Sequence, residues 1–356
     1  MDTITQGLLG AVTAQLRFRQ RIGRDATWVA AGAAIIPDLD ILIQPLTTLS
    51  GTENDELVRF VYHRGLSHSL LLVPVLALVV TFIWWNIRRA LKYHAGFGLL
   101  FGCVFAALLS HPLLDWCTSY GTLLFAPFST RRFALDAVPI IDVIYTPILI
   151  LTLTLCYAVR KAPLGRARTT LKIGWIGFSL SLAYLTAGYL MHNRAISALK
   201  EFSQKQGGKN SAQYDAYPQI GTIFLWRITR RDNISWTTAR INLLHNSTLD
   251  TLHVNHTRIR ENPWIHRALQ VPEIQTFQWF AMDQIRAVYQ RQDGNHVVDF
   301  HDMRYGREPD SLESLWSARV TLDHYGQVLR VERVHHYHGM GLGQVARRLW
   351  NEMWQP

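Results

Sequence analysis

The sequence predicts a mainly α-helical polytopic membrane bundle of five or six transmembrane helices, followed by a small soluble α+β domain. Apolar runs long enough to cross a bilayer all lie before about residue 192. Basic residues gather in alternate loops between these runs, and after about residue 200 the chain becomes polar, with β-branched and aromatic runs. We therefore expect two domains, residues 1–199 and 200–356.

The individual spans follow from the length of each apolar run, since a bilayer core requires about 20 residues of helix. Ile4–Phe18 is either a span or an amphipathic segment in the membrane interface. A soluble bundle would show polar faces at helical spacing, whereas Leu70–Trp85 is apolar on every side. The other expected spans are Ala26–Ile43, Leu66–Trp85, Ala95–Trp116, Val138–Val159 and Ile173–His192.

The loops between the spans predict an orientation. Lys and Arg are frequent in residues 17–24, 88–92 and 160–172, whereas residues 44–63 and 117–137 hold only Arg59, Arg131 and Arg132. The positive-inside rule makes the basic loops cytoplasmic. We therefore expect a multi-pass inner-membrane protein whose C-terminal domain lies on the periplasmic, outer side.

Composition argues against two other classes of protein. The formal net charge is +10, but its Lys and Arg are spread over short loops rather than gathered in one arm or face, so we expect no nucleic-acid partner. The cysteines, Cys103, Cys117 and Cys156, are odd in number and lie in or beside apolar runs. They do not form a disulfide framework.

A group of His, Asp and Arg side chains falls near one membrane face under this topology. Ionisable residues in membrane helices are energetically costly and usually functional. Histidines with only structural roles would not be expected to lie all at the same depth in the membrane. His111 and Asp115 are four residues apart and share a helical face. The group comprises Asp38, Asp40, His63, Arg64, His68, His111, Asp115, Asp136 and Asp142.

Imidazoles and carboxylates without a nearby thiolate suit zinc, and also manganese or iron. The candidate set exceeds what one tetrahedral ion needs, so one or more divalent ions are expected. Water activated by such a site would attack at phosphorus. The candidate metal ligands are Asp38, Asp40, His63, His68, His111 and Asp115.

Structural roles remain open for several of these residues. Asp38 or Asp40 could cap a helix or pair with Arg64, and His63 could anchor at lipid headgroups. Asp142 could hold a liganding histidine in one tautomer.

The remaining polar residues are assigned to catalysis and substrate binding. A guanidinium matches a phosphate through two parallel hydrogen bonds, and Arg64 lies inside the motif. We assign catalytic roles to Arg64 and Asp136, with Arg64 stabilising developing negative charge. Arg131, Arg132 and Asp142 are assigned to substrate binding, although Arg131 and Arg132 could instead anchor at headgroups.

These motifs resemble the YdjM-like family of bacterial membrane-bound metal-dependent hydrolases. The resemblance rests on Met1-Asp2…Thr5, Pro37-Asp38-Leu39-Asp40, His63-Arg64-Gly65-Leu66-Ser67-His68-Ser69 and His111-Pro112-Leu113-Leu114-Asp115. It continues through Tyr120-Gly121-Thr122 and Arg132-Phe133-Ala134-Leu135-Asp136, and covers roughly residues 1–147.

The family resemblance implies hydrolysis of a phosphoester. The family is similar to the helical zinc phospholipase C and nuclease superfamily, whose sites bind clustered zinc ions. Many relatives have His where this chain has Gln6, a poor zinc ligand, so one ion of such a cluster is expected to be missing or bound differently.

The function predicted from the sequence is a metal-dependent hydrolase of a phosphoester or lipid-derived substrate at the outer leaflet, with membrane lipids as partners. Two alternatives remain. A transport protein would place ionisable residues near the membrane midplane, whereas here they gather at one face. An amide hydrolase using the same metal is also open, although the chain lacks His-Glu-x-x-His.

The C-terminal domain is expected to hold a largely antiparallel sheet. Strands are predicted over Thr222–Thr229, Ser235–Leu243, Leu252–Ile259, His296–Tyr305, Leu315–Leu322 and Gln327–His335, with a helix over Pro272–Gln290. The stretch His335-His336-Tyr337-His338 lacks carboxylates at ligand spacing and is expected to be solvated rather than metal-binding.

Overall fold

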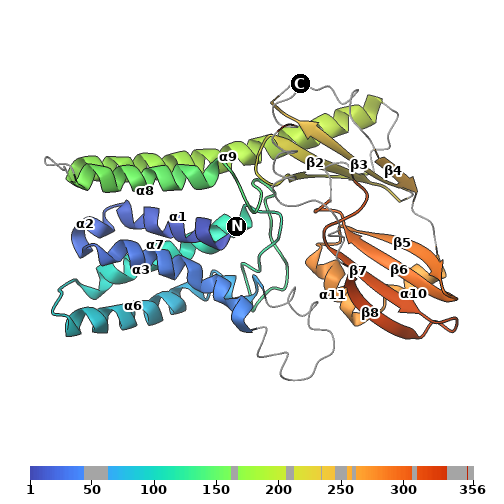
Figure 1. Cartoon of the computed structure of the whole chain (residues 1–356), viewed down its shortest axis with the longest axis horizontal. Helices are drawn as coiled ribbons and strands as arrows, with labels where there is room; N and C mark the ends of the chain where they lie inside the picture. The colour runs from blue at the N-terminus through green and yellow to red at the C-terminus, as the bar shows by residue number, and fades with distance from the viewer. Residues whose placement is uncertain are drawn as a thin grey trace. The chain divides into compact units, whose positions relative to one another are not determined.

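The structure is a computed structural model that describes residues 1–43, 63–161, 167–205, 212–233, 235–244, 255–258, 262–306, 311–334 and 351. The chain divides into two compact units, and among the described residues the boundary between them lies between Ala187 and Gly188. This boundary falls inside the long helix α9, Ala167–Lys205. Figure 1 shows the helices of the first unit and the strands of the second.

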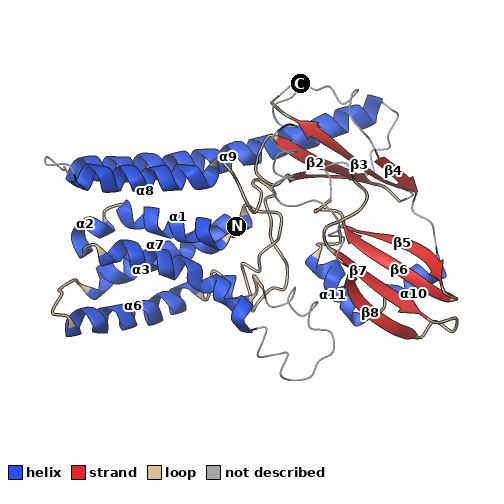
Figure 2. Ribbon diagram, in the orientation of Figure 1, coloured by secondary structure: helices blue, strands red, loops and turns tan. Residues whose placement is uncertain are grey.

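In its described residues, the first unit consists of helices and the loops between them (Figure 2). Helix α1 packs against α3, α7 and α8, and most of its residues are buried. The elements are α1 (Thr3–Gln15), α2 (Phe18–Ile22), α3 (Asp25–Ile35), the 3₁₀ segments η1 (Ile36–Ile43) and η2 (Leu66–His68), α6 (Val73–Ala90), α7 (Phe97–Trp116), α8 (Tyr145–Lys161) and α9.

Within the described residues, three helices are long and apolar enough to cross a membrane: α6, α7 and α9. The expectation of five or six spans is therefore not confirmed. Helices α1, α3 and α8 have 13, 11 and 17 residues. Pro37 follows the end of α3, where its missing N–H and fixed φ disfavour a continuing α-helix, and η1 takes over.

Two expected spans begin later than their apolar runs. Helix α6 starts at Val73 rather than Leu66, because η2 and a turn precede it. Helix α8 starts at Tyr145 rather than Val138, and the Asp142 carboxylate accepts hydrogen bonds from the amides of Ile144 and Tyr145 at 2.8 Å each. An aspartate in this position satisfies the free amides of a helix start.

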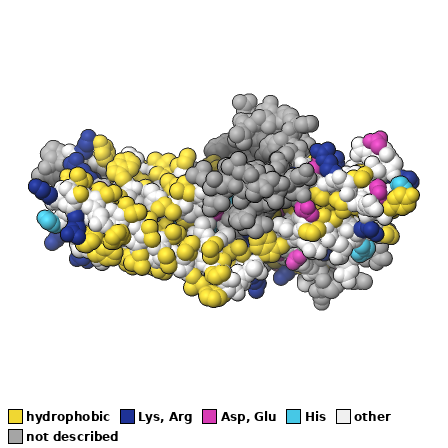
Figure 3. Space-filling model, turned by 90° about the horizontal axis from the view of Figure 1, so that it is seen from below, with side chains coloured by type: hydrophobic (Ala, Val, Ile, Leu, Met, Phe, Trp, Pro, Cys, Tyr) yellow, Lys and Arg dark blue, Asp and Glu magenta, His cyan; other side chains and the backbone are white. Residues whose placement is uncertain are grey.

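The helical unit carries a broad exposed apolar surface, which Figure 3 shows in yellow on the face it displays. Contiguous apolar surface of this extent is typical of a membrane or protein contact. The exposed side chains include Leu78, Val79, Phe82, Ile83 and Ile87 on α6, Ile150, Leu151 and Leu155 on α8, and Trp175, Ile176 and Leu180 on α9.

The basic residues lie at one end of the helical unit. Arg88 and Arg89 stand in the last turn of α6, and Arg160 and Lys161 in the last turn of α8. Figure 1 places the α6–α7 turn, α2 and the C-terminal end of α8 at the same end. The last turns of α7 therefore lie at the opposite end from these cations.

The second unit contains two four-stranded antiparallel sheets. Their strand orders are β1-β2-β3-β4 and β5-β6-β7-β8, so each is a simple meander. The strands are β1 (Gln213–Pro218), β2 (Leu225–Arg231), β3 (Ser235–Asn242), β4 (Asn255–Arg258), β5 (Ile285–Gln292), β6 (Asn295–Asp302), β7 (Ser317–Leu322) and β8 (Val328–Val334); the helices are α10 (Pro263–Ala268) and α11 (Pro272–Phe280).

The α+β expectation with antiparallel pairing is confirmed, with two sheets in place of one. The expected helix Pro272–Gln290 is wrong in its second half. Met282 and Asp283 have φ of 49° and 64°, which ends α11, and β5 begins at Ile285. The His335–His338 stretch lies outside the described residues.

The buried interior of this unit includes an ion pair. Arg304 Nη2 lies 2.7 Å from Asp302 Oδ2, and both side chains are fully buried. Burial lowers the pKa of the Arg304 guanidinium, but the charge and hydrogen bonds of Asp302 outweigh this and hold that pKa above its ordinary value.

Candidate metal centre

Three separate segments bring ionisable side chains together at the non-basic end of the helical unit. The 3₁₀ segment η1 presents Asp38 and Asp40, η2 presents His68, and the last two turns of α7 present His111 and Asp115. Asp38 and Asp40 are two residues apart, so the short 3₁₀ segment directs them to different sides of the His68 ring.

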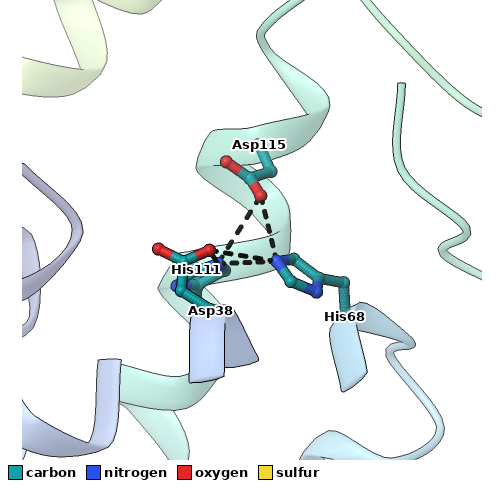
Figure 4. A group of neighbouring side chains, drawn as sticks. All are labelled: Asp38, His68, His111 and Asp115. Atoms are coloured by element: carbon teal, nitrogen blue, oxygen red, sulfur yellow. Dashed lines mark hydrogen bonds and ion pairs between the residues drawn. The ribbon is translucent and has the colours of Figure 1, made fainter. Parts of the chain in front are cut away.

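Asp38, His68, His111 and Asp115 form a buried group whose ligand atoms all lie within 4.8 Å of one another (Figure 4). The two Nε2 atoms are 2.9 Å apart. His68 Nε2 lies 3.5 Å from Asp38 Oδ1 and 3.3 Å from Asp115 Oδ2. His111 Nε2 lies 3.3 Å from Asp38 Oδ1 and 3.5 Å from Asp115 Oδ2. This group could hold a metal ion.

The hydrogen bonds on the far sides of the rings favour one tautomer for both histidines. His111 Nδ1 lies 2.5 Å from the Ala34 carbonyl oxygen, which can only accept. Ser67 Oγ donates to Asp40 Oδ2 at 2.7 Å and so accepts from His68 Nδ1 at 2.9 Å. These contacts assign the proton of each ring to Nδ1 and leave the two Nε2 atoms, 2.9 Å apart, as the nitrogens able to bind a metal. A cation between the Nε2 atoms would accept both lone pairs.

The geometry fits a small divalent ion. Bonds of about 2.0–2.1 Å to zinc place neighbouring ligands of a tetrahedron about 3.3–3.4 Å apart. The four nitrogen–oxygen separations, 3.3–3.5 Å, match that edge, whereas the separation of the two Nε2 atoms, 2.9 Å, is shorter than it. With both imidazoles neutral, the two carboxylates offer negatively charged oxygens to a divalent cation, and Asp115 also pairs with the Met1 nitrogen and with Arg64.

Asp115 is held by partners on one side and open on the other. Its Oδ1 accepts from Gln6 Nε2 at 2.9 Å and forms an ion pair with the Met1 nitrogen. Arg64 Nε lies 3.1 Å from Oδ2, yet no described residue gives this oxygen a well-aligned hydrogen bond. A buried carboxylate oxygen normally has such a partner, and this one faces both histidines.

Asp40 lies beside the group rather than in it. Its carboxylate accepts from His63 Nδ1 at 2.9 Å, from Ser67 Oγ at 2.7 Å and from the Arg64 amide at 3.1 Å. It also lies 3.4 Å from His68 Nδ1, on the side of the ring away from His111. A carboxylate in this position orients a liganding histidine and fixes its tautomer.

We predict that Asp40→Asn weakens zinc binding by about 10- to 100-fold without abolishing it, because the amide can also donate and no longer enforces one histidine tautomer. Competition with a fluorescent zinc chelator measures the dissociation constant. Asp38→Asn is the matched comparison: if Asp38 is a ligand and Asp40 is not, the Asp38 variant loses more affinity. Equal losses in the two variants would contradict this difference.

The other predicted residues lie around the group. His63 contacts Tyr120 edge-on, with ring centroids 5.4 Å apart, and is bound to Asp40 rather than directed at His111. Arg64 is buried, has a φ of 60°, and donates to Thr118 Oγ1 at 2.8 Å. A positive φ on a bulky residue is strained and is found at functional sites.

The polar residues of the 117–137 loop are spread over several positions. Arg132 is buried and donates to the Gly121 carbonyl at 2.7 Å, whereas Arg131 is exposed with its guanidinium 5.4 Å from the Phe133 ring centroid. Asp136 is half-buried with a φ of 51°, beside the end of α7. None of the three belongs to the four-residue group among the described residues.

Asp142 has a structural position. It is buried, caps α8, and accepts from the Tyr184 hydroxyl of α9 at 3.0 and 2.8 Å. We expect Tyr184→Phe to lower the free energy of unfolding of the helical unit by about 1.5 kcal/mol, because a buried carboxyl group loses a donor. Thermal unfolding in detergent measures this loss. Tyr189→Phe, an exposed tyrosine on the same helix, should change little, and equal effects would refute the role of Asp142.

The profile of the YdjM inner membrane protein family matches residues 1–195. The chain belongs to the YdjM inner membrane protein family. The match includes all residues of the metal group, and the predicted resemblance is confirmed. No curated protein and no solved structure matches the chain.

Several residues that contact the four-residue group were not predicted from the sequence. Thr3 Oγ1 donates to Asp38 Oδ2 at 2.7 Å, and the Ala34 carbonyl orients His111. Thr3 and Ser67 lie inside or beside the quoted motifs, which was the available signal. The carbonyl carries no sequence signal, because any residue at position 34 supplies one.

Proposed function

We propose that this YdjM-family protein is a membrane-embedded, metal-dependent hydrolase acting on a phosphoester, lipid-derived at the outer leaflet. The proposal rests above all on one observation: two imidazoles and two carboxylates from three segments lie buried with their ligand atoms within 4.8 Å of one another, so that they could hold a divalent ion. Burying these groups without an ion is costly, which argues for a functional role.

We take zinc as the expected ion, with manganese and iron as alternatives. Such an ion supplies Lewis acidity, polarising a phosphoryl oxygen and activating water. Asp38, His68, His111 and Asp115 would hold it. Hydrolysis would add the water oxygen to phosphorus, break the phosphorus–oxygen ester bond and deliver a proton to the leaving alcohol.

Arg64 would position Asp115 and present positive charge beside the reacting phosphate. Its Nε lies 3.1 Å from Asp115 Oδ2, and its Nη1 donates to Thr118. The guanidinium also stacks over Tyr120, 4.6 Å from the ring centroid, which fixes its plane. We further propose that the half-buried Asp136 exchanges protons at the site, and that Arg131 and Arg132 hold the rest of a substrate phosphate.

The charge distribution supports the proposal of a substrate at the periplasmic leaflet. The basic loops lie at one end of the helical unit and the metal group at the other. The positive-inside rule then directs the metal group outward, at headgroup depth. This depth favours a lipid-derived phosphoester over a soluble one.

The test is hydrolysis by purified protein in mixed lipid–detergent micelles. We expect release of phosphorylated headgroup or of phosphate, loss of release after chelation, and recovery on adding zinc. His111→Ala should be inactive, whereas His266→Ala, an exposed histidine of α10, should retain activity.

A parallel set of lipid-linked amide substrates distinguishes the bond that is cleaved. Metal-dependent hydrolysis of the amides alone would replace the phosphoester proposal with an amide hydrolase. Bound metal without hydrolysis of either set would contradict hydrolase function and leave a metal-binding membrane protein.

A further inference from the structure

A pocket lies at the turn between α6 and α7, at the basic end of the helical unit. Its volume is about 430 Å³, within the usual range for small-molecule sites. It is about 22 Å along α7 from His111, at 1.5 Å per residue, and shares no residue with the metal group. It is lined by Trp85, Arg89, Tyr93, His94, Ala95 and Gly96.

The cation in this pocket is held ready for an anion. The Arg89 guanidinium lies over the Trp85 ring, 4.7 Å from its centroid. Trp85 is itself fixed edge-on against Phe97, with centroids 5.8 Å apart. Stacking orders the guanidinium plane and leaves its edge N–H groups free, and that edge matches two phosphate oxygens.

No acidic side chain in the described part of the chain forms an ion pair with Arg89. Residues 85–96 contain Arg88, Arg89 and Lys92 and no Asp or Glu. The nearby carboxylate of Asp25 is taken by Arg88 and by Trp84 Nε1, which donates at 2.9 Å. Among the described residues, Arg89 has no carboxylate partner, whereas its neighbour Arg88 does.

An apolar path leads from the pocket along the membrane-facing side of α6. Successive residues among Leu78, Phe82, Trp85 and Arg89 are four, three and four positions apart, so the four side chains lie on one side of the helix. The Leu78 and Phe82 side chains are 49% and 59% exposed. A ligand with a phosphate head and an acyl chain can contact both the pocket and the apolar side of α6, whereas a free phosphate can contact only the pocket. Figure 3 shows Lys, Arg and His gathered at one end of the apolar surface.

We propose that this pocket binds the phosphodiester headgroup of an anionic phospholipid, with Arg89 on the phosphate, Trp85 as the stacking platform and the acyl chain along Leu78 and Phe82. A basic pocket between membrane helices is suited to such headgroups. The site is independent of the proposed hydrolase and does not require the metal group.

The experiment titrates delipidated protein in detergent with phosphatidylglycerol, phosphatidylcholine or glycerol 3-phosphate, and counts bound ligand by native mass spectrometry. Both lipids carry a phosphodiester, but only phosphatidylglycerol has a net negative charge. We expect phosphatidylglycerol to bind at least about fivefold more tightly than phosphatidylcholine, as one basic residue beside an anionic lipid predicts. Arg89→Gln should remove this preference. Arg168→Gln, an exposed arginine at the basic end, should keep it.

A second variant, Arg89→Lys, separates the effect of the positive charge from that of the guanidinium geometry. Arg89→Lys keeps the charge but lacks the planar fork, so it should recover only part of the preference. Equal losses in Arg89→Gln and Arg168→Gln would reveal diffuse attraction and overturn the pocket. Binding of glycerol 3-phosphate as tight as that of phosphatidylglycerol would overturn the lipid assignment, and so would the absence of any preference in the unmodified protein.

Discussion

Protein carrying His68→Ala and His111→Ala together should lose its bound divalent metal almost completely. The two Nε2 atoms lie 2.9 Å apart, and no other imidazole of the described residues belongs to the group. The two remaining carboxylates are a poor site for zinc, which favours nitrogen. We expect the affinity for zinc to fall by more than about 100-fold, since even partners of ligands contribute 10- to 100-fold.

Elemental mass spectrometry of detergent-purified protein measures metal per chain. The unmodified protein should carry at least about one ion per chain, since the four donors match one tetrahedral site. The control is His266→Ala with His324→Ala, two exposed histidines of the second unit, which should leave the metal content unchanged. If the unmodified protein stays without metal after zinc is added, both the metal centre and the hydrolase proposal fail.

Part of the candidate site could be predicted from the sequence. The motifs and the predicted topology put Asp38, His68, His111 and Asp115 at one face of the helical unit, and the structure brings these four side chains together. Spacing along the chain does not reveal the direction of a side chain, so it does not separate these four from Asp40 and His63, which contact each other beside the group. In a 3₁₀ segment, residues two apart point to different sides, and Asp40 contacts the Nδ1 atoms of His63 and His68.

Five or six spans are not confirmed, and hydropathy alone does not decide their number, because apolar residues score alike whether they face lipid or pack inside the protein. Most of α1 is buried against its neighbouring helices, so its apolar residues report protein packing as well as any contact with lipid. Pro37 and the cap at Asp142 shorten two further helices in ways that a count of apolar residues does not register. In the second unit, β5 was taken for helix because the break after α11 depends on two non-glycine residues with positive φ.

We expect Gly10→Leu in α1 to lower the stability of the helical unit strongly. A Cβ at Gly10 would lie 2.5 Å from the Ala30 carbonyl oxygen and 2.5 Å from Ala34 Cβ, both on α3. Backbone atoms of a packed helix cannot move aside as the end of a side chain can, so α1 and α3 must separate. Overpacking of this kind should lower the free energy of unfolding by about 3 kcal/mol.

The same separation should reach the metal group. Helix α1 supplies Thr3 to Asp38 and Gln6 to Asp115, while α3 supplies the Ala34 carbonyl to His111. Thermal unfolding in detergent and zinc affinity should therefore fall together in Gly10→Leu. Gly32→Leu on α3 is the matched control: a Cβ there meets nothing within 4 Å, and leucine gains about 0.5–1 kcal/mol of helix propensity over glycine. The two substitutions are thus expected to have opposite signs. A Gly10 variant as stable as the Gly32 variant would show that the close approach of α1 and α3 does not support the centre.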